Sequence, residues 1–297
     1  MTADRIGPSP REERLRLRPT TDLPDRAVQV QVRRYANGFL GDTSDEVAVE
    51  EPLELRVAGQ SVAVIMRTPG QDAYLAVGFF LSEGVIRAPG DVCSIELGAD
   101  RDGFPLANVL DLRLRPELEA ADQLRSRAFS VSAACGLCGT ASIAAIRSDF
   151  PPVNAEGTTT PAILLDLEDR LRAAQAVFQR TGGLHAAGLF DLQGQLITMH
   201  EDVGRHNAVD KVVGEQFLAG RVPLGDSILL ASGRASFELL QKSAIAGVSI
   251  FAAVGAPSSL AIELAEAAGI TLVGLLRSNR FVVYTYPERV ERPRGPV

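Results

Sequence analysis

The sequence predicts an α/β fold with a mostly parallel sheet in the C-terminal half and a β-rich N-terminal part. Short apolar runs alternate with helical segments through residues 207–286, which is typical of parallel strands joined by helices. Several earlier segments alternate apolar with polar residues, as strands do. Residues 149–161 are rich in Pro, Gly, Asn and Thr and indicate a linker. The expected organisation is a flexible tail (1–27), a β-rich part (28–148), the linker (149–161) and an α/β part (162–290).

Two glycine-bearing turns and one helix organise the predicted N-terminal part. Residues 28–33 alternate as a strand, and residues 53–57 and 62–66 flank Gly59-Gln60 as a hairpin. Asp72 is placed to cap a helix through residue 83, with Gly84 just past its end. Two further strands are expected at residues 92–97 and 108–114.

The predicted C-terminal part opens with a helix and a hairpin. Residues 162–180 have helical spacing of leucines and end at Gly182-Gly183, and strands 184–190 and 195–200 follow around a turn at 191–194. Helices are then expected at 207–218, 236–246 and 259–268, and strands at 227–231, 249–254, 270–276 and 281–286. Ligands of parallel sheets bind beyond the C-terminal ends of the strands, so the loops there are candidates for a binding site.

Bulk composition excludes several classes of protein. A net charge of −7 argues against a general nucleic-acid binder or a protein of anionic membrane surfaces. No apolar run approaches the roughly 20 residues of a membrane span, and residues 1–27 lack the apolar core of a secretory signal. Three cysteines do not make a disulfide framework in 297 residues, so a reducing cytoplasm is expected.

The sharpest local motif is A-C-G-L-C-G at residues 134–139. Its small residues leave Cys135 and Cys138 accessible, and such thiols suit persulfide or disulfide chemistry when a nearby cation or helix N-terminus favours the thiolate. Two other interpretations stay open from these residues alone. The pair is half of a zinc site completed by Cys93 or histidines, or it is simply two inert thiols.

All three histidines, His185, His200 and His206, fall within one short stretch that includes H-E-D-V-G-R-H-N at 200–207. Polar groups crowded between a hairpin and a helix can bind an anion or move protons. The alternative is structural, with Asp202 capping the helix while Arg205 and His206 are solvated or paired locally.

Three loops follow strands of the predicted parallel sheet: residues 232–236, 255–259 and 277–280. The first two open helices, whose free N–H groups favour phosphate, and the third offers the guanidinium groups of Arg277 and Arg280. Together they indicate a phosphorylated ligand. Neither G-x-x-x-x-G-K-[ST] nor G-x-G-x-x-G occurs, and the residues after His185 do not fit a zinc deaminase.

The chain resembles the FdhD family of formate dehydrogenase accessory sulfurtransferases over roughly residues 28–290. The resemblance is carried by long motifs in the family's order: C-G-L-C-G at 135–139, T-G-G-L-H-A-A-G at 181–188, E-D-V-G-R-H-N-A-V-D-K at 201–211, S-G-R-A-S-F-E-L-L-Q-K at 232–242, A-P-S-S-L-A at 256–261 and G-L-L-R-S-N-R at 274–280. It implies a fold similar to cytidine deaminases without their zinc, and a homodimer.

The resemblance also implies a function. Family members accept a persulfide from a cysteine desulfurase and pass sulfur to the bis-guanine-dinucleotide molybdenum cofactor, which formate dehydrogenase needs. By this likeness Cys135 is the persulfide carrier, Cys138 assists or resolves it, and no metal site is expected. The cofactor-binding segment is Leu275, Leu276, Arg277, Ser278, Asn279 and Arg280.

Two other functions use part of the same residues. A thiol-disulfide oxidoreductase would cycle Cys135 and Cys138 through a disulfide without needing a phosphate site. A non-catalytic chaperone of the molybdenum cofactor would need the arginine loop but not the thiols.

Overall fold

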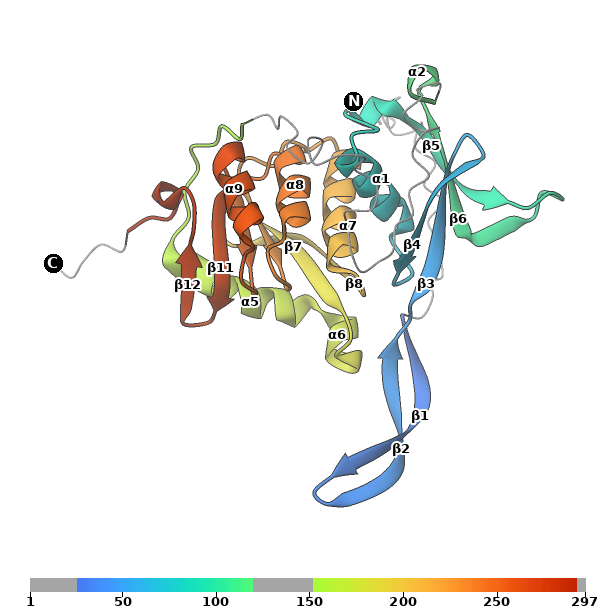
Figure 1. The fold of residues 1–297 in the computed structure, drawn as a ribbon, viewed down its shortest axis with the longest axis horizontal. Helices are drawn as coiled ribbons and strands as arrows, with labels where there is room; N and C mark the ends of the chain where they lie inside the picture. Colours follow the sequence, from blue (N-terminus) through green and yellow to red (C-terminus); the bar gives the residue numbers. More distant parts are fainter. Residues whose placement is uncertain (1–25, 120–151, 293–297) are drawn as a thin grey trace, which may run out of the picture.

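The computed structural model describes residues 26–119 and 152–292 and arranges them as three sheets with helices (Figure 1). A six-stranded sheet carries helices on both faces, a four-stranded sheet lies to one side of it, and a two-stranded ribbon projects away from the body. The mixed α/β class expected from the sequence is confirmed, and the likeness to cytidine deaminases stays a prediction. No helix in the described part of the chain has the length and apolar character to cross a membrane.

The four-stranded sheet has the order β4-β3-β6-β5. Its first two strands form the predicted hairpin, and the turn between them uses Ala58 and Gly59 with φ of 51° and 80°. β3 pairs with β6 in parallel, so this part is not purely antiparallel. The elements are β3 (Glu51–Val57), β4 (Gln60–Arg67), α1 (Asp72–Ser82), η1 (Pro89–Asp91), β5 (Val92–Ala99), β6 (Pro105–Leu114) and α2 (Pro116–Glu119).

The start of α1 corrects one detail of the sequence interpretation. Asp72 is the first helical residue and Gln71, in the left-handed region at φ 54°, occupies the cap position. The carboxylate of Asp72 instead accepts hydrogen bonds from the buried guanidinium of Arg67, at 3.0 and 2.9 Å. An ion pair with the preceding strand therefore replaces the expected cap.

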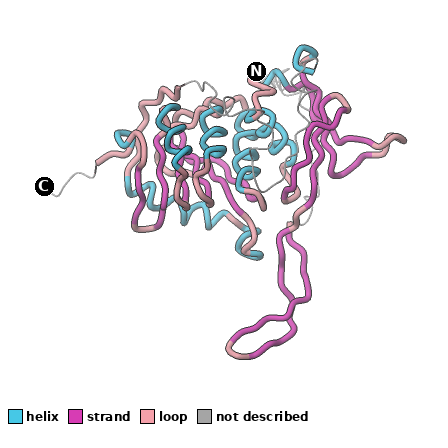
Figure 2. Tube along the Cα trace, in the orientation of Figure 1, coloured by secondary structure: helices cyan, strands magenta, loops and turns pink. Residues whose placement is uncertain are grey.

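The ribbon consists of β1 (Ala27–Ala36) and β2 (Phe39–Ala48), paired antiparallel along their whole length. It extends from the body as a long hairpin, which Figure 2 shows as two magenta strands with no helix against their outer half. The sequence predicted only the core of β1. β2 was missed because F-L-G-D-T-S-D-E-V-A places polar residues on both faces, as an exposed strand can.

The C-terminal half contains the six-stranded sheet in the order β12-β11-β10-β9-β7-β8. β9, β10 and β11 are parallel, but the pairs β7·β8, β7·β9 and β11·β12 are antiparallel. The sheet is thus mixed, which corrects the expectation of a mostly parallel one. The reason is that two tight hairpins, at residues 192–195 and 278–279, reverse the chain without a crossover helix.

The elements of this half follow the predicted order. They are α5 (Pro161–Ala174), α6 (Ala176–Thr181), β7 (His185–Asp191), β8 (Leu196–Asp202), α7 (Arg205–Leu218), β9 (Ser227–Ala231), α8 (Phe237–Ile245), β10 (Ile250–Ala253), α9 (Ser259–Ala268), β11 (Thr271–Arg277), β12 (Arg280–Val283) and η2 (Pro287–Arg289). One predicted helix, 162–180, is two helices here, because Gln175 leaves the helical region at φ −80° and ψ 72°.

Alternate residues of the central strands point into two cores. On β9, Leu229 and Ala231 pack beneath α7, α8 and α9, whereas Ile228 and Leu230 face the leucines of α5. Each strand is buried on both sides, which explains its nearly continuous apolar run. Figure 1 shows α5 below the sheet and α7, α8 and α9 above it.

The two halves meet where α1 crosses α7 at close range. Gly78 of α1 and Gly214 of α7 lie at the crossing, and a Cβ on Gly214 would overlap the carbonyl oxygen of Tyr74. The larger core contains residues of the four-stranded sheet, of α1 and of α7 alike. One continuous core therefore connects the β-rich part with the α/β part, and the boundaries proposed between them stay a prediction.

Candidate functional site

The carboxyl ends of β9, β10 and β11 meet at one edge of the large sheet because these strands are parallel. The chain stays hydrogen-bonded beyond the ends of β9 and β10: Gly255 N–H donates to Gly233 O at 2.8 Å, and Leu275 N–H, near the end of β11, donates to Gly255 O at 3.1 Å. Ser258 N–H also donates to Ala235 O at 3.0 Å. The structure thus brings together the three loops that the sequence singled out, and we call this region the carboxyl edge.

Gly255 is required for this close approach. A Cβ at its position would lie 2.7 Å from the Cα of Arg234, so the loops after β9 and β10 can only touch if residue 255 has no side chain. Ser258 caps α9 by accepting a hydrogen bond from Ala261 N–H at 3.2 Å.

The segment predicted to bind the cofactor forms the end of β11 and its turn into β12. Leu275 is 39% exposed with φ at 53°, inside a strand whose pairing is irregular between Gly274 and Arg277. Leu276 is buried, while Arg277, Ser278, Asn279 and Arg280 are exposed. An exposed leucine in a strained conformation is a recognised sign of a functional surface.

Arg277 is partly engaged by the protein itself. Its Nη1 donates to the carbonyl oxygens of Val254, at 2.7 Å, and Leu276, at 2.6 Å. Both bonds use the same terminal nitrogen, Nη1, and they hold the exposed guanidinium across the loop after β10. Arg280 pairs with Arg277 in the hairpin register, which places two cationic side chains side by side.

His185 lies at the same edge because β7 runs antiparallel to β9 and therefore begins where β9 ends. Its Nδ1 is 3.2 Å from the Ser232 Oγ, and that oxygen accepts a hydrogen bond from Ala186 N–H at 2.9 Å. The serine hydroxyl hydrogen is then available to Nδ1, which favours the tautomer with its proton on Nε2. Burial, and then the charges of Arg205 and His206, lower the pKa of His185, so the neutral ring is favoured.

The first turn of α7 supplies Arg205 and His206. His206 Nε2 lies 2.8 Å from Oε2 of Glu238 and 3.4 Å from Oγ of Ser236, both at the start of α8. Arg205 runs along Gly233, where a Cβ would come within 3.1 Å of its Cδ. Its Nε is buried and has no hydrogen-bond partner among the residues that the structure describes.

The third histidine is not part of the carboxyl edge. His200 Nε2 lies 2.7 Å from Glu215 of α7, and its ring packs against Tyr74 of α1. Of the three clustered histidines, two therefore face the loops and one supports the helix packing. Glu238 was not singled out by the sequence, although its place two residues after Ser236 at a helix start was a usable signal.

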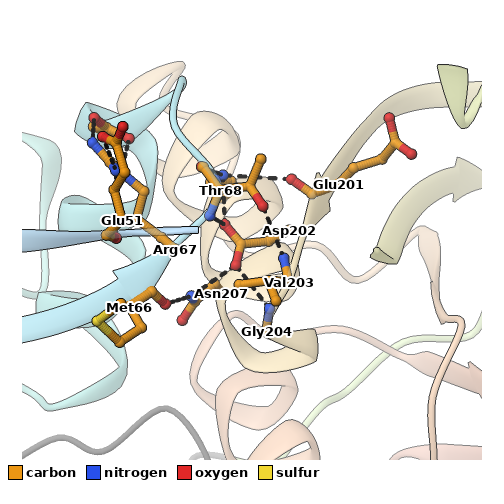
Figure 3. A network of polar contacts seen from close by, with 11 residues as sticks. Glu51, Met66, Arg67, Thr68, Glu201, Asp202, Val203, Gly204 and Asn207 are labelled. Carbon is orange, nitrogen blue, oxygen red and sulfur yellow. Dashed lines mark hydrogen bonds and ion pairs between the residues drawn. The ribbon is translucent and has the colours of Figure 1, made fainter. Parts of the chain in front are cut away.

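Much of the motif E-D-V-G-R-H-N-A-V-D-K serves the architecture, as Figure 3 shows. The carboxylate of Asp202 contacts Lys211 Nζ at 2.7 Å, and both side chains are fully buried. It also accepts hydrogen bonds from Gly204 N–H, Asn207 Nδ2 and Thr68 N–H, at 2.9, 2.8 and 3.2 Å. Asp202 thus has a structural role, but it does not cap α7 as the structural interpretation expected, because Gly204 occupies the cap position without a side-chain cap and Asp202 binds Lys211 and the chain entering the helix instead.

This network also crosses between the two halves. Lys211 Nζ donates to Thr68 O at 2.9 Å, Asn207 Nδ2 donates to Met66 O at 2.8 Å, and Val203 N–H donates to Thr68 Oγ1 at 3.2 Å. Burial lowers the pKa of Lys211, and the carboxylate of Asp202 opposes that shift. The end of β4 is therefore held directly against the start of α7, next to Arg205 and His206.

Asp210 and Lys242, two further residues of the shared motifs, connect α7 to α8 and α1. Lys242 of α8 donates to both carboxylate oxygens of Asp210 at 2.8 Å, and Ser82 of α1 donates to Oδ1 at 3.0 Å. Burial raises the pKa of Asp210, while Lys242 opposes the shift. Glu201 caps α6 by accepting from Phe178 N–H at 2.7 Å.

Cys135 and Cys138 lie outside the described residues, so their geometry is not part of this site. Cys93 is exposed on β5 of the four-stranded sheet. Within residues 26–119 and 152–292, no group of three or more His, Cys, Asp or Glu side chains is arranged to hold a metal ion.

Comparison with known proteins identifies the family. The model of the FdhD/NarQ family matches residues 48–291. Proteins named sulfur carrier protein FdhD are 48% identical in Streptomyces coelicolor, over 88% of this chain and 94% of that one, and 49% identical in Mycobacterium tuberculosis, over 83% and 92%. A third, from Sulfolobus acidocaldarius, is 40% identical over 89% and 98%.

A solved structure supports the fold. A crystal structure from Desulfotalea psychrophila, assigned as a formate dehydrogenase accessory protein, matches with a TM-score of 0.69 at 24% identity and covers 89% of this chain and 99% of that one. The family match spans most of the chain, and relatives far above 30% identity match it almost end to end. This chain therefore belongs to the FdhD/NarQ family.

Proposed function

We propose that this chain carries sulfur as a persulfide on Cys135 and delivers it to the bis-guanine-dinucleotide molybdenum cofactor of a formate dehydrogenase. The observation that carries the proposal is the pair of thiols in C-G-L-C-G within a chain whose relatives are named sulfur carrier proteins. A sulfur carrier needs an accessible thiol that attacks as thiolate, and the small neighbours of Cys135, Ala134 and Gly136, favour access.

The loading step balances without an external oxidant or reductant. The Cys135 thiolate attacks the outer sulfur of a persulfide on a cysteine desulfurase, and a new S–S bond forms as the donor's S–S bond breaks. The electron pair of the broken bond leaves on the desulfurase cysteine, which becomes a thiolate. We assign Cys138, three residues further along the sequence, to assisting this exchange or resolving the persulfide.

The carboxyl edge is the surface we assign to the cofactor. Support comes from Leu275 and the segment Arg277 to Arg280, which are exposed, from the start of α9 and from the two neighbouring arginines of the β11–β12 turn. Helix N-termini and guanidinium groups are the usual ligands of phosphate, and the cofactor carries phosphates in each guanine dinucleotide. Leu275 offers an apolar surface for a flat ring beside them.

We assign His185 a proton-handling role at this edge. A neutral ring held by Ser232 presents Nε2–H as a hydrogen-bond donor, and its Nδ1 can take up a proton by way of the Ser232 hydroxyl to give the imidazolium, which then returns it. His206, held by Glu238, lies at the start of the same helix as Arg205 and is assigned to positioning Arg205. We further propose that the carrier acts in the cytoplasm as a homodimer, with a fold related to cytidine deaminases.

The carrier step is tested by mass spectrometry after incubation with a cysteine desulfurase and cysteine. The expected result is one added sulfur, about 32 Da, on the peptide containing Cys135, absent in Cys135→Ala. Cys93→Ala is the matched control, because Cys93 is an exposed thiol elsewhere and its removal should leave loading unchanged. No added sulfur, with the desulfurase active toward another acceptor, would reject the carrier.

Two outcomes would favour the other functions. If Cys135→Ala still activates formate dehydrogenase fully, the protein is a cofactor chaperone without thiol chemistry. If both thiols are oxidised to a disulfide while a substrate dithiol is formed, it is an oxidoreductase. Cofactor binding is tested separately with guanosine diphosphate as probe. Arg280→Ala should weaken it, and Arg113→Ala, which removes an exposed side chain of β6 in the four-stranded sheet, should not.

A further inference from the structure

The projecting ribbon formed by β1 and β2, here called the arm, touches the body only near its base among the described residues. Ala27 and Ala48 join a small cluster with Val177 and Leu184, and Arg180 pairs with Glu46 at 2.8 Å. The rest of the hairpin extends away from the protein, as Figure 1 shows in blue. A two-stranded hairpin is marginally stable in water when neither face is covered.

The two faces of the arm differ in where their apolar residues lie: one has them at the base, the middle and the tip, and the exposed part of the other has them only at the tip. Residues paired directly across the two strands point to the same face, and the faces alternate along the strands. One face, called the valine face, carries five pairs from base to tip: Val28/Val47, Val30/Asp45, Val32/Thr43, Arg34/Gly41 and Ala36/Phe39. The opposite face carries Gln29/Glu46, Gln31/Ser44 and the ion-paired Arg33/Asp42 before Tyr35/Leu40 at the tip.

The valine face is too exposed for a surface without a function. The exposed fraction is 48% for Val28, 39% for Val47 and 75% for Phe39, at positions where a polar side chain would also fit an exposed strand. Exposed apolar residues along one face of a projecting element, with an acidic and a basic residue between them, indicate a contact with another molecule.

We propose that the valine face binds the same face of a second copy of this chain, with the two arms antiparallel and a two-fold axis at Val32. The order of the five pairs supports a second copy as the partner. Read from base to tip on one arm and from tip to base on the other, apolar pairs meet apolar pairs and the acidic pair meets the basic pair. In this register Val28 and Val47 at the base of one arm meet Ala36 and Phe39 at the tip of the other. An isologous contact requires this kind of self-complementarity.

Charge supports the same register. The pair Val30/Asp45 of one copy faces the pair Arg34/Gly41 of the other, so each Asp45 comes opposite a side-chain-free Gly41 and beside Arg34. Within one chain Arg34 Nη2 already lies 3.1 Å from Asp45 Oδ2, and both groups are exposed. The Arg34 and Asp45 side chains of the two copies form a group of four alternating charges around the axis. Such a group determines the register of the contact more than it raises its affinity.

This inference rests on the homodimer in the proposed function and names the surface that forms it. Sulfur loading of Cys135 is measured separately by mass, so a failure of the arm contact and a failure of the carrier step are distinguishable. A monomer that still loads sulfur would overturn the homodimer and its arm contact and leave the carrier step standing.

The test uses two full-length variants, Arg34→Asp and Asp45→Arg, and measures mass by sedimentation. Each variant loses the pair within its own chain and places like charges across the two-fold axis, so its dimer dissociation constant should rise at least about tenfold. Mixed together, the variants place opposite charges across the axis and should form a heterodimer. Only a contact between chains explains recovery on mixing, because neither chain regains its internal pair.

Three results would overturn the proposal: an unmodified chain that is a monomer at micromolar concentration, variants that dimerise as well as it does, and a mixture that stays monomeric. Circular dichroism of each variant checks that the fold is retained.

A cysteine placed on the axis provides a second measurement. Val32→Cys should form a disulfide-linked dimer under mild oxidation, because each copy presents its residue 32 to the other. Gln31→Cys is the matched control on the polar face, and the unmodified chain controls for the native thiols. Cross-linking of Gln31→Cys equal to that of Val32→Cys would show that the arms do not meet through the valine face.

Discussion

Replacing Asp202 by Asn should destabilise the fold by about 3–5 kcal/mol, the usual cost of removing one partner from a buried ion pair. The carboxylate accepts four hydrogen bonds, two on each oxygen, and both members of its pair with Lys211 are fully buried. Asparagine retains one carbonyl oxygen for Gly204 N–H and Asn207. Its NH2 group then faces two donors, Thr68 N–H and the Lys211 ammonium, and leaves that charge uncompensated.

The assay is urea denaturation followed by far-ultraviolet circular dichroism, because the chain contains no tryptophan. Asp42→Asn removes one partner of the exposed pair with Arg33 and should cost less than about 1 kcal/mol. Adding Lys211→Met to Asp202→Asn removes the orphaned charge and should restore about 2 kcal/mol relative to additivity. A loss below about 1 kcal/mol for Asp202→Asn, or one equal to that of Asp42→Asn, would refute the reasoning.

Other predictions concern pH and packing. Histidine titration by NMR should give His185 a pKa below 6.5, and Arg205→Gln should raise that pKa. In the window just below pH 6.5 the native ring binds fewer protons than the unfolded one, so the free energy of unfolding should rise with pH there. The hydrogen bond from His200 lowers the pKa of Glu215, so the ionised carboxylate contributes its full stabilisation above pH 4.5 and loses it as pH falls through the lower native pKa. Glu215→Gln should therefore weaken the dependence of unfolding free energy on pH in that acid range. Gly214→Ala should destabilise by about 3 kcal/mol in urea, and wild-type stability would contradict the close helix crossing.

The sequence predicted elements best where local pattern and tertiary role agree. Strand 227–231 and helix 259–268 match β9 and α9 residue for residue, because a doubly buried strand is apolar throughout and a serine capped the helix. The helix break at Gln175 was not predictable, since Glu201 from β8 caps α6 across space. Strand direction around β7 was missed for the same reason, because periodicity carries no information on pairing.

The candidate site was predicted in part. The three loops and the position of His185 follow from strands ending at one edge, which a sequence pattern can indicate. Pairings such as His206 with Glu238 depend on how α7 sits against α8, and no local signal specifies that. The separation of His200 from the other two histidines likewise depends on its place within β8, where it turns toward Tyr74.

The fastening of α7 on several sides has a consequence for insertions and deletions. Its first turn carries the site residues, Lys211 binds Thr68 just after β4, Asp210 binds Lys242 of α8, and Gly214 packs against α1. One inserted residue rotates everything beyond it by about 100°, so it would misalign these contacts together. The tip of the arm, where Asn37-Gly38 turns in the open, can absorb the same insertion locally. Length variation among related chains should therefore collect at that tip and be absent from α7.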